Sequence, residues 1–488
     1  MAARGRAVTR LSRGTLPEVR HDRVQLPPPP ALAQQVGILH LGIGAFHRAH
    51  QAVFTEDAAL ASDQEGWGIC GVTQRSAAVV DQLRPQDCLY AVLERGVGDP
   101  SVRVVGQVSD VLFAAEEGPR LTARFADPAV RLVTLTVTEK GYRRGSDGGL
   151  DLTDPVVAAD LAGGARSTVG QLVRGLQARR AASAGPVSVL SCDNLTGNGE
   201  VLRRLVMDFC RALPSAEGDA IGSWVEQHVA FPSSMVDRIV PATTDADRAD
   251  AATLLGVVDQ ALVVAEPFRQ WVVEDAFAAG RPAWERAGAD LVDDVEPFEQ
   301  LKLRMLNGTH SLLAYLGALR GYETIAEAVS DAELASAAQR LMREDVAPTL
   351  EQPPGLDVTA YGETVLERFA NPALRHRTTQ VAMDGSQKLP LRLLTTVRDR
   401  LAAGATPEWA SLAVAAWMAY VAAGRDRHGR QLPLDDPLAD RLRSAVGTGS
   451  DPVAVATGLL GVREVFGDDL RDSAVFRDAL VRHLKELL

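Results

Sequence analysis

The sequence predicts an α/β fold in the N-terminal part of the chain and a mostly α-helical C-terminal domain. Short apolar segments alternate with stretches of helical spacing in the first part of the chain, and long helical patterns with few strand signals fill the rest. Strands that alternate with helices are typical of a parallel sheet with crossover helices. The chain has 488 residues, more than a single hydrophobic core usually holds, so two domains are expected.

The N-terminal domain is predicted over residues 31–294. Residues 1–30 are expected to be an irregular lead-in, because the four prolines at its end fit neither a helix nor a central strand. Apolar segments predict buried strands at residues 36–41, 68–72, 102–108, 132–137 and 187–190. Helical spacing falls between them, for example at residues 49–60 and 167–182.

The C-terminal domain is predicted over residues 295–488, with a border near residues 293–296. Apolar residues recur there at helical spacing, which predicts helices rather than strands. The patterns run over residues 297–319, 331–344, 357–369, 389–403 and 407–423.

Composition and charge narrow the classes of partner. The net charge of −12 argues against a surface for nucleic acid or anionic membrane, since both need excess lysine and arginine. No apolar run approaches the roughly 18 residues of a membrane span, and no secretory signal is recognisable. The four cysteines are scattered without a CxxC pair. We therefore expect reduced thiols and a cytoplasmic protein.

A Gly-X-Gly turn at residues 42–44 follows the first predicted strand and precedes a helical stretch. This is the context of a Rossmann-type dinucleotide-binding turn, in which glycines let the backbone approach a pyrophosphate and a helix N-terminus supplies free N–H groups. His47 stands where a third glycine is usual, so a turn without a ligand stays open as an alternative. The candidate cofactor-binding residues in this segment are Gly42, Gly44, Phe46 and Arg48.

The end of the second predicted strand bears on the choice between NAD and NADP. It reads Thr73-Gln74-Arg75-Ser76, without the acidic residue that binds the ribose of NAD. Arg75 and Ser76 can hold a 2′-phosphate, or they can be ordinary exposed loop residues. NAD is the expected cofactor, NADP remains an alternative, and Arg75 joins the candidate cofactor-binding residues.

Two histidines raise the question of a metal site. His47 and His50 lie three residues apart at the start of a predicted helix, but no third or fourth zinc ligand stands at short spacing nearby. We interpret them as surface histidines or as histidines that support the site from behind. No metal is predicted.

Lys302, Asn307 and His310 fall on one predicted helix. At about 100° per residue, His310 lies about 80° around the helix from Lys302, and Asn307 about 60° from His310. Polar groups on a side that also carries Leu306 and Leu313 must be hydrogen-bonded or functional. A lysine in a partly desolvated pocket loses its proton more easily, as a general base needs. An amphipathic helix with a satisfied histidine and an exposed lysine is the alternative.

Seven segments in register resemble the polyol-specific long-chain dehydrogenases, the family of mannitol 2-dehydrogenase and fructuronate reductase. They are residues 41–51, 135–142, 191–194, 231–239, 266–271, 302–310 and 383–388. The resemblance implies a Rossmann-type N-terminal domain, a helical C-terminal domain, NAD(P)-dependent chemistry without a catalytic zinc, and a monomer.

Carried over position by position, the resemblance also implies roles for single residues. Lys302 is implied as the general base of alcohol oxidation, and Asn194 and Asn307 as the amides that hold the reacting oxygen. His310 is implied to orient the substrate, and Glu139 to lie at the mouth of a proton path.

Other residues of the matching segments are less decided. Asp237 and Lys388 are implied to line the substrate pocket, with a salt bridge or loop anchor as the alternative. Asp193 lies in a matching segment, and its role can equally be structural. Glu266 and Arg269 are interpreted as a structural ion pair.

The substrate is predicted from the segment before Lys388. Mannitol-type members often carry an arginine eight residues before this lysine, where this chain has Gln380. Residues 139–142 and 303–308 also look closer to the fructuronate reductase branch. The prediction therefore favours a sugar acid, D-fructuronate reduced to D-mannonate, over D-mannitol oxidised to D-fructose or a related pentitol. A carboxylate needs a nearby cation, for which Arg375, Arg377 and Lys388 are candidates, although all three can equally be surface charges.

Two further readings belong to other classes. The chain could bind a nucleotide without catalysis, although the intact set of Lys302, Asn307, His310 and Asn194 argues against this. It could also be a metal-dependent alcohol dehydrogenase, which a metal assay would separate from the rest.

Overall fold

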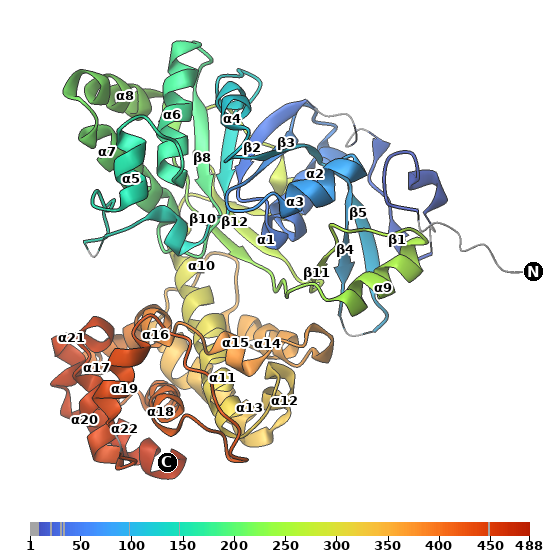
Figure 1. Ribbon diagram of the computed structural model, residues 1–488. Coiled ribbons are helices and arrows are strands. Elements are labelled where there is room, and N and C mark those ends of the chain that lie inside the picture. The colour runs from blue at the N-terminus through green and yellow to red at the C-terminus, as the bar shows by residue number, and fades with distance from the viewer. Residues whose placement is uncertain are drawn as a thin grey trace, which may run out of the picture. The chain divides into compact units, whose positions relative to one another are not determined.

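The computed structural model describes residues 9–19, 22–29, 32, 35–96, 98–145, 147–447 and 449–488. The chain divides into two compact units, unit 1 from Met1 to Glu296 and unit 2 from Pro297 to Leu488. In Figure 1 unit 1 runs from blue to yellow and unit 2 from yellow to red.

The central sheet of unit 1 has six parallel strands in the order β6-β3-β2-β7-β8-β9. All six residues of the strand β2 are buried, and they are apolar except for His40. A parallel sheet is covered on both faces, which explains why its strands are continuous apolar runs. The predicted α/β class with a Rossmann-type sheet is confirmed. The strands are β2 (Val36–Leu41), β3 (Gly68–Thr73), β6 (Val108–Phe113), β7 (Leu132–Leu135), β8 (Val187–Ser191) and β9 (Val229–Ala230).

Crossover helices cover the two faces of this sheet (Figure 1). Side chains alternate along a strand, so Leu39 and Leu41 belong to one hydrophobic core and Ile38 to another. The first core includes α4 (Gly118–Phe125), α5 (Pro155–Leu161), α6 (Thr168–Ala181), α7 (Asn198–Ala212) and α8 (Ser215–His228). The second includes α1 (Ala45–Ala49), α2 (Gln51–Ser62) and α3 (Ala78–Leu83).

Two smaller sheets complete unit 1. One is ordered β1-β5-β4-β11 and the other β10-β12-β13, and α9 (Asp245–Leu255) contributes to the core beside the first. Their strands are β1 (Val24–Gln25), β4 (Tyr90–Glu94), β5 (Ser101–Val105), β10 (Ser234–Asp237), β11 (Val263–Ala265), β12 (Gln270–Glu274) and β13 (Asp290–Val292).

Two features of unit 1 differ from the sequence prediction. The described part of residues 1–30 is not wholly irregular, because β1 pairs in parallel with β5 and Leu11 is fully buried. The apolar segment 102–108 forms parts of two strands, β5 and β6, which lie in different sheets. Gly106 and Gln107 separate them, and the amide of Gly106 donates to Glu56 rather than to a strand.

Unit 2 is helical throughout its described residues, apart from isolated bridges. Two of its helices, α11 (Thr309–Leu319) and α18 (Glu408–Ala423), are buried on nearly all sides and pack against each other. Such helices are apolar all round because no side faces water. Around them lie α10 (Glu296–Leu301), α12 (Ile325–Ser330), α13 (Ala332–Arg340), α14 (Val358–Phe369), α15 (Thr378–Val381), α16 (Gly385–Leu389), α17 (Thr395–Ala402), α19 (Ala439–Val446), α20 (Pro452–Leu460), α21 (Arg463–Arg471) and α22 (Ala474–Leu487).

Three segments of unit 2 are π-helical. They are Lys302–Gly308, Leu341–Val346 and Pro390–Leu394. The first continues α10 into α11 and carries two of the residues that the sequence analysis selected. Short π-helical segments inside helices are frequent at functional sites.

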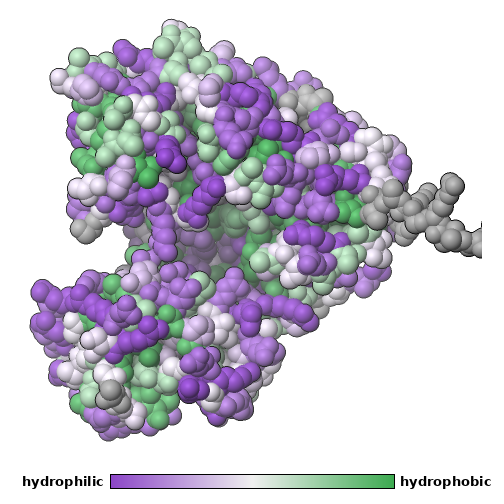
Figure 2. All heavy atoms as spheres, viewed as in Figure 1, coloured by the Kyte–Doolittle hydropathy of each residue, from purple (hydrophilic) through white to green (hydrophobic). Residues whose placement is uncertain are grey.

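None of the helices in the described parts of the chain combines the length and the apolarity that a membrane span needs. Figure 2 shows hydrophilic residues spread over the visible face of each unit, with hydrophobic ones scattered between them.

Candidate active site

The glycine turn after β2 has the geometry that a pyrophosphate-binding turn needs. Gly42 has a φ of +103°, and a Cβ there would lie 2.1 Å from the carbonyl oxygen of Thr136, so only glycine fits. At Gly44 a Cβ would meet nothing closer than the Gly42 oxygen at 3.8 Å. The side of Gly44 is therefore open, and the first N–H groups of α1 follow directly after it.

Phe46 and Arg48, the other candidates in this segment, are placed differently. Phe46 is partly buried and stacks on His50, with ring centroids 5.1 Å apart. The guanidinium of Arg48 is buried and donates to the carbonyl oxygens of Gly44 and Ala261. Arg48 thus ties the turn to the interior, and its charge points away from solvent.

The structure decides between the two interpretations of His47 and His50. Both are buried, with 1% and 0% of their surface exposed, so the surface interpretation is wrong and they support the turn from behind. Burial lowers the pKa of His50 to about 3, so its ring is neutral near neutral pH. No group of three or more histidine, cysteine, aspartate or glutamate side chains suited to a metal ion occurs among the described residues.

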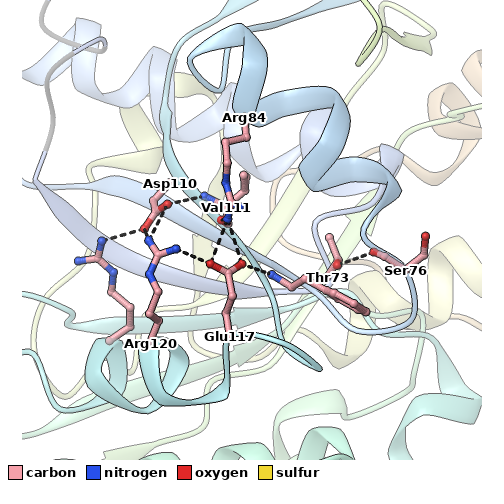
Figure 3. A network of polar contacts seen from close by, with 9 residues as sticks. Thr73, Ser76, Arg84, Asp110, Val111, Glu117 and Arg120 are labelled. Carbon is pink, nitrogen blue, oxygen red and sulfur yellow. Dashed lines mark hydrogen bonds and ion pairs between the residues drawn. The ribbon is translucent and has the colours of Figure 1, made fainter.

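The loop after β3 lies beside a network of charged residues (Figure 3). Arg75 and Ser76 are exposed, and the hydroxyl of Thr73 donates to the Ser76 carbonyl at 2.7 Å. The neighbouring carboxylates of Asp110 and Glu117 are bound by arginines, for example Glu117 by Arg84 at 2.9 Å. Asp110 accepts from Arg120 and Arg124. These acids are thus engaged in ion pairs with nearby arginines.

The ends of β7 and β8 are tied together by Asp193. Its carboxylate accepts hydrogen bonds from the amides of Val137 at 3.1 Å and Thr138 at 2.9 Å, and from the Tyr142 hydroxyl at 2.7 Å. Thr138 is held at φ 68° and ψ 159°, a region that residues other than glycine rarely occupy. These hydrogen bonds fit a structural role for Asp193.

This anchored loop presents two of the predicted site residues. Glu139 directly follows Thr138, and Asn194 directly follows Asp193. Both side chains are exposed. Asp193 is buried, and burial raises the pKa of its carboxyl group while the three donors act in the opposite direction. The Asp193 carboxylate therefore fixes the backbone next to both exposed polar residues, Glu139 and Asn194.

Asp237 ends the strand β10 and is buried, with its partner Gln270 opposite it on β12. In the same region Arg269 forms its ion pair with Asp57 at 2.6 Å, and Glu266 accepts from the amide of Ile239 at 2.7 Å. Arg269 is thus paired with Asp57 on helix α2, which corrects the interpretation of Glu266 and Arg269 as an ion pair with each other.

In unit 2, the segment that carries Lys302 and Asn307 is a π-helix, not the α-helix that the angular prediction assumed. In an α-helix these two residues would lie about 140° apart. Hydrogen bonding from residue i to i+5 widens the turn, so Asn307 comes one turn after Lys302 and closer to the same side. Lys302 is buried, with 6% of its surface exposed. A Cβ on Gly308 would lie 2.9 Å from the Arg392 carbonyl oxygen, so glycine permits this close approach of two π-helical segments.

His310 lies in a buried and electropositive environment. Its ring stacks on Phe369 at 4.6 Å and meets His376 edge-on at 4.8 Å. Burial holds the pKa of His310 well below its usual range, and the neighbouring His376, Arg392, Arg368 and Lys388 lower it further. His310 is therefore neutral near neutral pH and can donate one hydrogen bond and accept another.

Of the cations that the sequence analysis selected, Lys388 lies near this environment. Its ammonium donates to the Val381 carbonyl at 3.3 Å and lowers the pKa of His376, which burial and this charge bring to about 4. Arg375 and Arg377 are exposed.

The sequence analysis did not select Arg392 and Arg368 as candidate cations. Arg392 donates to the Ser311 hydroxyl at 3.2 Å, directly beside His310. It stands one helical turn after Lys388, and this spacing was the signal that could have identified it.

Comparisons with known proteins agree with this architecture. The family description "Mannitol dehydrogenase Rossmann domain" matches residues 36–286, and "Mannitol dehydrogenase C-terminal domain" matches residues 294–488. The chain belongs to the mannitol dehydrogenase family. It is an oxidoreductase of that family, and the predicted resemblance is confirmed.

The relatives differ in the substrate that their names give. The D-mannonate oxidoreductase of Escherichia coli K12 is 42% identical over 92% of this chain and 93% of that protein. The uncharacterized oxidoreductase YeiQ of the same organism is 44% identical over 96% of this chain and 94% of that protein. A solved complex of Pseudomonas fluorescens mannitol 2-dehydrogenase with NAD and D-mannitol matches with a TM-score of 0.88 and 37% identity, covering 98% of this chain and 96% of that one.

In this family member the candidate residues fall into two groups, one in each unit. Unit 1 contributes the glycine turn and polar side chains at the ends of its strands, including Glu139, Asn194 and Asp237. Unit 2 contributes a buried amine, an amide and a neutral imidazole from one helix, with arginines and a lysine around the imidazole. The primary amine, the amide and the imidazole of unit 2 are groups that can exchange a proton with a hydroxyl group and bind its oxygen.

Proposed function

We propose that this oxidoreductase reduces D-fructuronate to D-mannonate at the expense of a nicotinamide dinucleotide. The observation that carries the proposal is the cluster of cations around His310, formed by Lys388, Arg392 and Arg368. A carboxylate is the substrate group that such a cluster favours, because charge-assisted hydrogen bonds to carboxylates are about twice as strong as neutral ones. The name of the E. coli relative, D-mannonate oxidoreductase, supports a sugar acid as substrate.

Lys302 is proposed as the group that exchanges the proton of the reacting hydroxyl. In reduction its ammonium Nζ gives a proton to the oxygen, and in oxidation the amine takes the proton back. The amine is buried, so water competes little for this proton. Glu139 is exposed and is proposed to pass protons between Lys302 and solvent.

Asn194 and Asn307 are proposed to hold the reacting oxygen through their amide N–H groups. Negative charge develops on this oxygen during the reaction, and fixed donors stabilise it best where water is excluded. The neutral His310 is proposed to orient the substrate through a neighbouring hydroxyl. Asp237 and Lys388 are proposed as further polar residues that line the pocket, with Arg375 as a candidate at its edge.

The turn at residues 42–44 fits a dinucleotide, because Gly44 is open on one side and the N–H groups at the start of α1 follow it. When bound, a nicotinamide dinucleotide supplies or accepts a hydride at C4 of its nicotinamide ring. We propose NAD as the cofactor, in line with the NAD in the matching mannitol 2-dehydrogenase complex. NADP stays the alternative, because Arg75 and Ser76 are exposed where an acidic residue is otherwise usual.

Oxidation of D-mannitol to D-fructose is the second candidate function. It is favoured by the TM-score of 0.88 to a structure that holds D-mannitol. The two candidates differ in one group, since fructuronate carries a carboxylate where fructose carries a hydroxymethyl group. The cation cluster gives the sugar acid priority.

Turnover of purified protein tests this proposal. D-fructuronate and D-fructose are each offered with NADH and with NADPH, and the loss of reduced cofactor is followed by absorbance. Fast turnover of fructuronate supports the proposal, whereas turnover of fructose alone would replace it with mannitol dehydrogenation. Lys302→Ala is the control for the proton-transfer role, and full activity of this variant would overturn that assignment.

We further propose that the protein acts as a monomer in the cytoplasm. The four cysteines are free and buried, as expected for reduced thiols. Light scattering on the purified protein tests the oligomeric state, and a mass of twice the chain's would contradict it.

A further inference from the structure

We propose that His40 is a positioning residue for the dinucleotide-binding turn, where it holds the carbonyl group of Gly42 together with Thr136. The proposal rests on the family's dinucleotide and is independent of the choice of sugar substrate. His40 is the one polar residue of strand β2, and it is fully buried. It lies two residues before the turn.

Three hydrogen bonds converge on the Gly42 carbonyl oxygen. The Thr136 hydroxyl donates at 2.7 Å, the His40 Nε2 at 3.2 Å and the amide of Gly44 at 2.6 Å. Gly42 has a positive φ and no side chain that could fix its peptide, so outside contacts must do so. His40 and Thr136 supply these contacts from β2 and from the residue after β7.

The hydrogen bond to Gly42 requires one tautomer of His40. A carbonyl oxygen can only accept, so this bond needs the proton on Nε2, which also lies 2.9 Å from the Thr136 hydroxyl oxygen. Nδ1 is then bare and accepts from the Thr134 hydroxyl at 2.7 Å. Both ring nitrogens are used, which fits a neutral ring, and burial lowers the pKa of His40 to about 3.

The direction of the Gly42 carbonyl matters for an anionic ligand. The oxygen carries partial negative charge, and it would repel a pyrophosphate if the peptide turned over. Held by the Thr136 and His40 donors, the peptide is kept from turning over, and the N–H groups at the start of α1 follow directly after the turn. His40 therefore acts on the ligand through the backbone and does not need to touch it.

The packing of His47 explains why a histidine stands where a third glycine is usual. Its ring stacks on that of His40 with centroids 3.3 Å apart and an angle of 14°. Its ring nitrogens have no hydrogen-bond partner among the described residues, so packing is the contribution that the structure assigns to it. Burial keeps its pKa well below the usual range, so the two rings stack without charge repulsion.

Binding of NADH to three variants tests the proposal, with calorimetry as a readout that does not depend on turnover. His40→Leu and Thr136→Val each remove one donor to Gly42. We expect each to raise the Kd for NADH about tenfold, the effect of one hydrogen bond. His40→Gln can still donate from its amide, so it should recover most of the affinity. The KM for the sugar should change little in all three.

Thr396→Val is the control for the threonine-to-valine change, because Thr396 is buried in unit 2 and its hydroxyl has no hydrogen-bond partner within the described chain. It should bind NADH like the wild type. A wild-type Kd for His40→Leu or Thr136→Val would overturn the proposal. So would equal losses of affinity in His40→Gln and His40→Leu, since these would indicate a merely structural role. If His40→Leu does not fold, Thr136→Val and His40→Gln carry the test.

Discussion

Replacing Asp193 by asparagine should lower the activity of the protein much more than its stability. The carboxylate of Asp193 accepts one hydrogen bond on Oδ1, from Thr138, and two on Oδ2, from Val137 and Tyr142. An asparagine must turn its NH₂ group toward one of these sites. The less costly orientation places it opposite the Thr138 amide, so one partly buried donor loses its acceptor.

The expected loss of unfolding free energy is at most about 1–3 kcal/mol, the cost of a fully buried unsatisfied donor, because the Thr138 amide is only partly buried. Removal of the buried charge offsets part of it, so the loss should lie at the low end. The functional loss should be larger. Thr138 is held in a strained conformation by this carboxylate, and the candidate residues Glu139 and Asn194 adjoin the two anchored positions. A displacement of about 1 Å at such residues can lower the rate about 100-fold.

Asp160 offers a matched control. It is also fully buried, and its Oδ1 accepts one donor, from Arg166, while its Oδ2 accepts two, both from Ser167. Asp160→Asn should therefore lose similar stability in urea unfolding yet keep the wild-type kcat/KM. If both variants fold, lose the same stability and show equal kcat/KM, the positioning role of Asp193 is refuted.

Three further predictions follow from the charges. Arg392→Met should lower kcat/KM for D-fructuronate about 10- to 100-fold, the worth of a charged hydrogen bond, and leave D-fructose unaffected. Arg398→Met, which removes an exposed arginine paired with Asp469, should change neither, and a loss with both sugars in Arg392→Met would argue for a structural role. Arg75→Ala should raise the Kd for NADPH and not that for NADH, and parallel changes in calorimetry would show that Arg75 does not sense the 2′-phosphate. The pKa of His40 is about 3 in the folded protein against 6.5 when unfolded, so the unfolded chain binds more protons between these two values. The contribution of His40 to stability is therefore complete above pH 6.5 and is lost as the pH falls toward 3. Denaturation midpoints of the wild type that stay constant over this range would contradict the sign, and an identical change in His40→Gln would contradict His40 as the source.

The sequence predicted the parallel sheet well because burial on both faces leaves a simple signature. The strand β2 reads as an apolar run, and the glycine turn after it is a local pattern that needs no knowledge of distant residues. The segment 102–108 was harder, since the break between two sheets depends on Glu56, which accepts from Gly106 across the fold. Such a contact is not visible in local spacing.

The candidate site was predictable where it lies in contiguous motifs and not where it depends on helix type or distant contacts. The angles predicted for Lys302, Asn307 and His310 assumed an α-helix. The π-helical segment changes the relative directions of Lys302 and Asn307. Arg392 belongs to another helix and comes beside His310 only through the fold. His40 looked like part of an apolar strand, and its role depends on Thr136, almost a hundred residues away in sequence.

The ratio of kcat/KM for D-fructuronate to that for D-fructose, measured on the wild-type protein with NADH, tests the central claim most directly. A site with cations placed for a carboxylate should reject the analogue that lacks it, and we expect a ratio of at least about 100. A ratio below one would contradict the sugar-acid assignment and identify the polyol as the substrate.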